Sequence, residues 1–342
     1  MAARPTGAPD HAPRSLVAVV GWGVAVTYLG WPQLLARLPL GLALKNELAL
    51  APQQVAAFWA VATIPWYLKP LAGLIADATA SRRRASLAFG SLVGALAWLA
   101  FAVVPRGYAA LLVVAVAVNA ALVFVSANVG GLLVAAGQRH GATGRLSSLR
   151  QTLVGVVNLA AGPVGGWLAG RAFGWTVGLG ALIVGSFVPV SLALLRAPDL
   201  RPSPRSQVTA RVRATLTSRT TLTVAALVFL FYVAPGLQTP LLYYQQDVLR
   251  FDPLFMGLLQ TWAGAGVIIG AAIYAVVCRF VPIRWSLPLG VVLSAATTLA
   301  YLGYDSRTSA IVIHFLTAIT GTMAVLPVYD VAARASPEGS ES

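Results

Sequence analysis

Charged residues are scarce in this sequence, and acidic ones most of all. Only 10% of the 342 residues are charged, with 10 Asp or Glu against 24 Lys or Arg, and 58% are hydrophobic. A soluble globular domain is about 25% charged, so the composition excludes an ordinary soluble enzyme. A single cysteine, Cys278, excludes an internal disulfide framework.

Motifs for enzyme chemistry are also missing. The chain has two lysines, Lys45 and Lys69, and neither lies in a G-x-x-x-x-G-K phosphate loop. It has no HExxH, no CxxC, no paired-Asp cluster and only three scattered histidines, so no metal set is indicated. The sequence therefore predicts a protein that is not an enzyme and needs no cofactor.

Long apolar runs are what the chain does have. A membrane-spanning helix needs about 20 mostly apolar residues. Runs between breakers predict ten spans and an all-α polytopic membrane protein, in which the first span is too long to be straight and should be tilted or broken near Pro32. The predicted spans are 16–44, 54–77, 85–104, 108–136, 146–170, 173–195, 221–245, 254–278, 285–304 and 308–333.

The basic residues predict the orientation of these spans. Seventeen Lys or Arg fall in the segments on the N-terminal side of the membrane, and six fall in the opposite ones, namely Arg37, Lys45, Arg106, Arg171, Arg250 and Arg307. By the positive-inside rule both termini are cytoplasmic, in a cell inner membrane with lipid around the spans. Because the basic charge is spread over every cytoplasmic loop, nucleic acid is not an expected partner.

An internal repeat divides the chain. A shift of 201 residues overlays PLGLALKNELALAP at 39–52 on PLLYYQQDVLRFDP at 240–253. We therefore predict a tail at 1–15, a six-helix bundle at 16–195, a linker at 196–220 and a second bundle at 221–342. Two parallel six-span halves are the architecture of the major facilitator superfamily. Residue 342 maps onto residue 141 of the first half, so spans eleven and twelve are not expected in this sequence.

The predicted second span, with IPWYLKPLAGLIAD at 64–77, is the most informative stretch. Pro65 and Pro70 remove backbone donors inside the helix, so a kink is expected. Lys69 lies about 12 Å from Asp77 along the helix axis, near the bilayer midplane, where a charge costs about 2.5 to 3.5 kcal/mol. It should face an aqueous substrate or ion pathway, or else a structural anionic partner. Asp77 is expected either to be solvated or to form a gate pair between helices, because it lies beside Arg82 to Arg84.

Four further polar residues in the predicted spans have two readings each. His314 could relay protons, or be a neutral imidazole packed in the protein. Asp330 could replace an acid missing from span four, or pair with Arg334. Gln238 and Tyr243 lie in a broken stretch of span seven, where a planar ring could stack on the tyrosine, although interfacial anchoring explains an aromatic residue there equally well.

The second-span motif, with RRR at 82–84, closely resembles that of the folate-biopterin transporter family, a branch of the major facilitator superfamily. Stretches at 38–56, 135–152, 240–257 and 336–342 look like the same family. The resemblance implies a proton-coupled or exchange carrier for pterins and folates. The resemblance also implies a role in the site for the residues that match the family, namely Pro65, Trp66, Lys69, Gly73, Asp77 and Arg150. It implies a gate role for the loop that contains Arg82 and Arg83.

The fourth span departs from this family's pattern. The family usually has acidic residues there, whereas this chain has Ser126, Gly130 and Ala135. The sequence therefore predicts a secondary carrier, working by alternating access, for a small organic anion such as a folate or pterin, with protons as a candidate coupling ion. The alternatives are a carrier for another small organic solute, and a non-transporting remnant or partner subunit.

Overall fold

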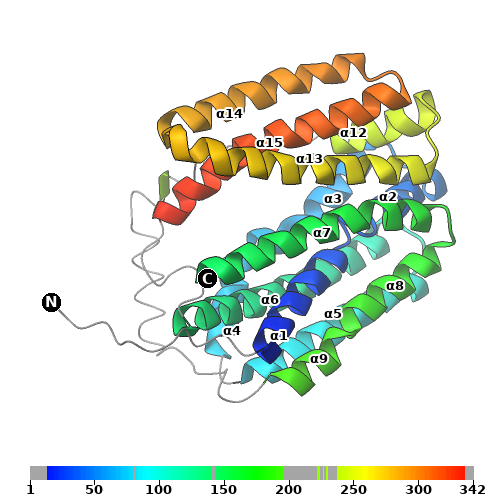
Figure 1. The fold of residues 1–342 in the computed structure, drawn as a ribbon. Coiled ribbons are helices and arrows are strands. Elements are labelled where there is room, and N and C mark those ends of the chain that lie inside the picture. The colour runs from blue at the N-terminus through cyan, green and yellow to red at the C-terminus, as the bar shows by residue number, and fades with distance from the viewer. Residues whose placement is uncertain are drawn as a thin grey trace.

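The computed structural model describes residues 14–79, 82–140, 143–195 and 237–335, together with Leu222, Thr223, Ala226 and Phe229. Every regular element in these residues is helical (Figure 1). Among them, five stretches are long and apolar enough to cross a membrane, at 83–103, 108–133, 173–194, 253–277 and 307–328. The chain is therefore a polytopic α-helical membrane protein, as predicted. The predicted linker at 196–220, and the tail at 1–15 apart from its last two residues, lie outside the described residues.

The first half follows the predicted spans closely. Its elements are α1 (Arg14–Leu29), α2 (Arg37–Leu42), the π-helix η1 (Ala43–Glu47), α3 (Pro52–Tyr67), α4 (Lys69–Ala78), α5 (Arg83–Val103), α6 (Tyr108–His140), α7 (Thr143–Ala169), α8 (Phe173–Gly185) and α9 (Phe187–Leu194). Apolar runs set these boundaries, because each long run forms one helix or two helices separated by a short break. The breaks are therefore the features that need a separate explanation.

The predicted first span is broken, as expected. Helix α1 ends at Leu29, and a short loop with Trp31 and Pro32 leads to α2. Pro32 has no N–H and cannot continue the helix. The freed carbonyl of Gly30 accepts a hydrogen bond of 2.9 Å from the buried indole N–H of Trp98 on α5. The break is thus stabilised by a tertiary contact rather than left exposed in an apolar environment.

The second span breaks at Leu68, between α3 and α4. Pro65 and Pro70 flank this residue, and the Leu68 N–H bonds to the Pro65 carbonyl at 3.1 Å, a tighter turn than the α-helix has. The kink predicted from the two prolines is confirmed. The predicted sixth span also breaks, at Ser186, because Pro189 cannot donate to the carbonyl of Gly185.

The helices described for the second half begin with the repeat. They are α12 (Gln238–Tyr243), the π-helix η4 (Tyr244–Val248), α13 (Pro253–Phe280), α14 (Ile283–Thr298), the 3₁₀ helix η5 (Leu299–Gly303) and α15 (Arg307–Ala335). The pair α12 and η4 lies 201 residues after the pair α2 and η1, with identical lengths. Positive φ angles recur at the same shift, 50° at Ala49 and 55° at Arg250. The predicted repeat is therefore present in the backbone.

Two ends of the bundle are named from here on. The π-helix end holds η1 and η4, together with the α7–α8 connection and the start of α13. The termini end holds the first residues of α1, in the lower middle of Figure 1, and the last residues of α15, at its left.

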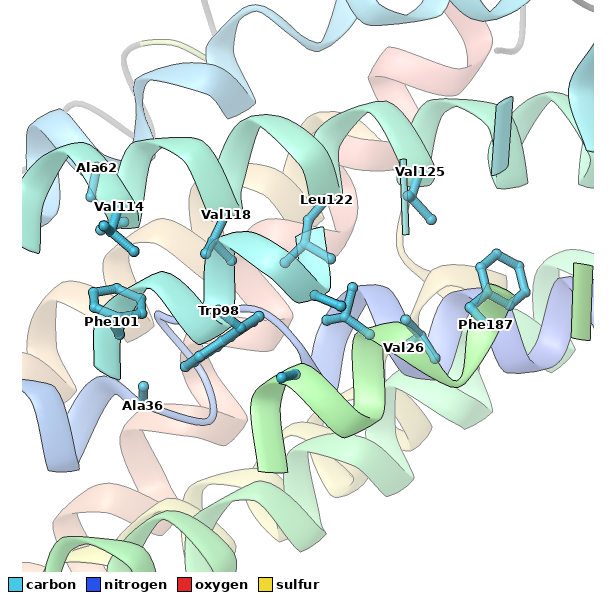
Figure 2. Close-up of a cluster of buried hydrophobic side chains, with 14 of the residues drawn as sticks. Val26, Ala36, Ala62, Trp98, Phe101, Val114, Val118, Leu122, Val125 and Phe187 are labelled. Carbon is cyan, nitrogen blue, oxygen red and sulfur yellow. The ribbon is translucent and has the colours of Figure 1, made fainter. Parts of the chain in front are cut away.

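Large apolar side chains fill the first half. Figure 2 shows Trp98 and Phe101 of α5 facing Val114, Val118 and Leu122 of α6 across the cluster. Trp98 is fully buried, and a Cβ on Gly180 of α8 would lie only 2.5 Å from its ring. A glycine is therefore needed there if the indole is to pack between α5 and α8.

The two halves pack together through α7 and α13, which lie side by side in Figure 1. A Cβ on Gly257 would lie 2.4 Å from the Gly162 carbonyl oxygen and 2.7 Å from the Gly166 Cα. The backbones of the two helices therefore touch near the π-helix end. Small residues of this kind allow close helix packing inside membranes.

Candidate functional site

A buried asparagine joins the breaks of the first and second spans to α6. The Asn119 side-chain oxygen accepts the indole N–H of Trp31 at 3.0 Å and that of Trp66 at 2.7 Å. Its amide nitrogen donates to the Ala115 carbonyl at 2.8 Å. The two indole rings lie 5.3 Å apart between centroids, and Asn119 is fully buried. One amide thus fixes both tryptophans.

Lys69 is the first residue of α4, directly after the break in the second span. Its ammonium lies 5.7 Å from the centroid of the Trp66 ring, close enough for a cation–π contact. The side chain is half-buried. Because Asn119 fixes the Trp66 ring, the ring gives the lysine stem and ammonium a fixed surface to lie on.

A second cation, Arg150 of α7, lies near enough for its charge to act on Lys69. The Arg150 guanidinium donates to the Tyr28 hydroxyl at 3.4 Å. The ion pairs of the described residues all lie at the π-helix end, and none includes Lys69 or Arg150. We call Tyr28, Trp31, Trp66, Lys69, Asn119 and Arg150 the central cluster. It carries two positive charges that no described carboxylate neutralises.

A polar contact between the halves lies at the π-helix end. The Lys45 ammonium of η1 pairs with the Asp247 carboxylate of η4 and donates to the Gln246 oxygen at 2.8 Å. It also lies 4.9 Å from the Tyr243 ring centroid, and the Tyr243 hydroxyl donates to the Leu50 carbonyl. We call these five residues the interface cluster. They join the two copies of the repeat.

An aromatic group surrounds His314 on α15. The His314 ring nitrogen lies 3.1 Å from the Tyr304 hydroxyl, which also accepts a hydrogen bond from Gln245 of η4. The Tyr301 ring stacks on Tyr304 at 5.7 Å and meets the imidazole edge-on at 6.3 Å. This placement favours the reading of His314 as a packed, hydrogen-bonded imidazole.

The remaining predicted gate residues lie at the termini end, in and after α4. A Cβ on Gly73 would meet nothing within 4 Å. Arg82 is exposed, whereas Arg83 is buried against α6, where its guanidinium would lie 3.0 Å from a Cβ on Gly131. The sequence did not predict this burial. The side chains of Asp77 and Asp330 lie outside the described residues, so their pairing stays a prediction.

The structure thus brings together three of the six predicted substrate-binding residues. Lys69 lies over the Trp66 ring, Arg150 belongs to the central cluster through its hydrogen bond to Tyr28, and Pro65 is buried as part of the kink. Tyr243 belongs to the interface cluster, and Gln238 is exposed near it, at the start of α12. Their predicted contact with substrate stays a prediction.

The sequence analysis did not select four residues of these clusters, although the sequence around each of them has a feature that could have identified it. Asn119 is the only polar residue in the apolar run 109–125 of α6, which marks it for a buried contact. Trp31 precedes the proline of the first break. Lys45 and Asp247 are charged residues within the repeated stretch, next to one another after the 201-residue shift.

Known proteins resemble this chain in sequence and in fold. The BT1 family pattern matches residues 30–192. The folate-biopterin transporter of Synechocystis sp. is 28% identical over 337 residues, which cover 90% of this chain and 66% of that protein. This chain therefore spans just under two thirds of the length of that curated relative.

Two solved structures show the same fold at low sequence identity. A bacterial homologue of the human lysosomal transporter Spinster, inward-facing and unoccupied, has a TM-score of 0.71 at 15% identity and covers 98% of this chain and 78% of its own. The nucleoside transporter NupG has a TM-score of 0.71 at 13% identity, with 94% and 85% covered. The chain thus has a major facilitator fold whose residues 30–192 carry the BT1 family pattern, and the predicted resemblance to folate-biopterin transporters is confirmed.

Proposed function

We propose that this chain is a carrier, not an enzyme, that binds a small organic anion in the central cluster and moves it across the membrane by alternating access. One observation supports this proposal above the others. Lys69, which lies over the Trp66 ring, and Arg150, which donates to Tyr28, form no ion pair with any described carboxylate. Such cations are costly at membrane depth unless water or an anion compensates them.

The two cations suit different parts of anion recognition. A lysine ammonium is a compact point charge, and an arginine guanidinium can grip a carboxylate with two parallel N–H bonds. A bound carboxylate that pairs with one of these cations would also offset the positive charge of the other. The free energy of binding would therefore be more favourable than that of a single ion pair.

The tryptophans suit a flat ring beside that anion. Trp66 is held by Asn119 and presents a ring face next to Lys69, and aromatic rings stack on planar partners at little entropic cost. A folate combines a planar pterin with a carboxylate tail. Together with the name of the Synechocystis relative, this chemistry makes folate or a related pterin the proposed substrate.

Alternating access would use the contact between the halves. The interface cluster and the α7–α13 contact both join the halves at the π-helix end, so we propose that this end is closed here and that transport requires it to open. Following the positive-inside rule, we propose that it faces outward, in the inner membrane, with both termini in the cytoplasm.

Proton coupling would require a titratable side chain on the transport pathway. The described acidic side chains, Glu47, Asp247, Asp252 and Asp305, all lie near the π-helix end, and three of them form ion pairs. The other candidates that the sequence offers are Asp77, Asp330 and His314. Exchange of one anion for another would need none of these groups.

The test is uptake of labelled folate and of a labelled pterin into cells or vesicles that carry this 342-residue chain, beside an empty control. Saturable folate uptake that Lys69→Ala abolishes, with the protein still inserted, is the expected result. Arg150→Gln should weaken uptake, and Lys69→Arg should retain part of it because the charge remains.

A matched control removes a cation elsewhere. Arg250→Gln takes one exposed positive charge from the π-helix end, far from Lys69 along the bundle, and should leave uptake unchanged. Equal uptake by Lys69→Ala and the unmodified chain would refute the assigned site. No uptake from well-inserted protein would favour a non-transporting partner subunit, and uptake of another organic anion alone would change the substrate.

A further inference from the structure

A basic and aromatic patch lies on the outside of the bundle where α7 is connected to α8. Helix α7 ends at Ala169 and α8 begins at Phe173, so the connection contains only Gly170, Arg171 and Ala172. This connection belongs to the π-helix end (Figure 1). Since α7 is apolar over 153–169 and the stretch 173–194 is long and apolar enough to span a membrane, the connection between them lies at the height where a bilayer changes from acyl chains to headgroups.

Arg171 has no acidic partner among the described residues, unlike two other arginines at this end. At the same end, Arg106 pairs with Glu47 and Arg307 pairs with Asp252. Arg171 is exposed, and no ion pair of the described residues includes it. Its guanidinium instead lies 5.0 Å from the Trp167 ring centroid. The ring positions the guanidinium, and the guanidinium keeps its N–H donors for a ligand.

Two exposed tryptophans flank this arginine. Trp167 of α7 and Trp175 of α8 meet edge to face at 6.3 Å, although 45% and 61% of their surfaces remain exposed. A soluble protein rarely leaves two large rings in this way, but Trp is enriched at the membrane–water interface. The pair therefore marks the headgroup level on this side of the bundle.

A groove runs from this patch along α8 into the apolar zone. Its volume is 480 Å³, and its lining consists of Ala172, Gly174, Trp175, Gly178, Leu179 and Leu182. Side chains at spacings of three and four share one helix face. A Cβ at Gly174 or Gly178 would meet nothing within 4 Å, so these glycines are not required for packing between helices. They leave the groove open.

We propose that this patch binds one anionic phospholipid, with its phosphate on Arg171 and an acyl chain in the groove along α8. The N-terminal end of α8, where the Trp175 N–H bonds to the Ala172 carbonyl at 2.9 Å and no side chain caps the helix, adds positive potential beside Arg171. An acyl chain fits the apolar lining. The unpaired guanidinium matches a phosphate diester in charge and in its paired donors.

The test measures lipid retention by native mass spectrometry of the full chain purified in detergent. The probes are dioleoyl phosphatidylglycerol and dioleoylglycerol. They have the same two acyl chains, but only phosphatidylglycerol has a phosphate in its headgroup. We expect one retained phosphatidylglycerol and about tenfold weaker retention of dioleoylglycerol. Arg171→Gln should lower phosphatidylglycerol retention by about tenfold, in keeping with the loss of charged hydrogen bonds.

Two further variants separate the site from general effects. Gly178→Leu, at a position where an added Cβ would meet nothing within 4 Å, places a side chain in the groove and should also lose the lipid. Arg307→Gln removes an exposed cation at the same end of the bundle, and this variant should still retain phosphatidylglycerol. Unchanged retention in Arg171→Gln, equal loss in Arg307→Gln, or equal binding of both probes would each overturn the proposal.

Discussion

Replacing Asn119 by leucine tests the central cluster most sharply. Leucine has a similar volume, but it cannot accept the two indole N–H groups that now bond to the Asn119 oxygen. Each buried donor left without a partner costs about 1 to 3 kcal/mol. Hydrogen bonds between membrane helices are often worth less than this. We therefore expect the free energy of unfolding to fall by about 2 kcal/mol, the low end of the range for two donors.

A matched control lies on the same helix. Asn128 is also fully buried, and its amide nitrogen bonds to the Phe124 carbonyl just as Asn119 bonds to that of Ala115. The Asn128 oxygen, however, has no hydrogen-bond partner among the described residues. Asn128→Leu should therefore be close to neutral.

Thermal unfolding in detergent, followed by tryptophan fluorescence, makes the comparison. At about 2 to 4 °C per kcal/mol, Asn119→Leu should lower the Tm by roughly 4 to 8 °C relative to Asn128→Leu. The emission spectrum should also change in Asn119→Leu alone, because Trp31 and Trp66 lose their shared partner. Equal Tm values for the two variants would refute the reasoning.

Three further predictions concern the repeat and the joint between the halves. At Ala49, which has a φ of 50°, Ala49→Val should lower the Tm because a β-branched residue is strained there, whereas Ala49→Gly should not. Lys45→Asp and Asp247→Lys should each reduce uptake by placing like charges together, and the double exchange should restore it. Gly257→Ala should reduce both Tm and uptake, because its Cβ would meet the backbone of α7, whereas Gly321→Ala, where nothing lies within 4 Å, should be neutral in both assays.

Helices and their breaks were predictable because they depend on local chemistry. Apolar runs fix where a chain can cross a bilayer, and Pro32, Pro65 and Pro70 fix where it cannot remain regular. The 201-residue shift was visible in the sequence because both copies need the same proline and leucine positions around one backbone bend. The structure carries the same shift in the bend itself.

The π-helices and the cluster contacts were not predictable in this way. The residues that adopt positive φ, Ala49 and Arg250, are not glycines, so the sequence has no local mark for the bend. Burial of Arg83 depends on the space left by Gly131 on another helix. The partner of Lys45 lies in the other half of the chain. Contacts of this kind arise only when the helices pack.

The central claim is that Lys69 holds the anionic group of the substrate. Its most direct test is the affinity of the purified chain for folate and for biopterin, which lacks the carboxylate tail, in the unmodified protein and in Lys69→Gln. We predict that the substitution raises the Kd for folate about tenfold, the value of a charge-assisted pair, and changes that for biopterin less than about twofold. An equal change for both ligands, or none for folate, would contradict the account.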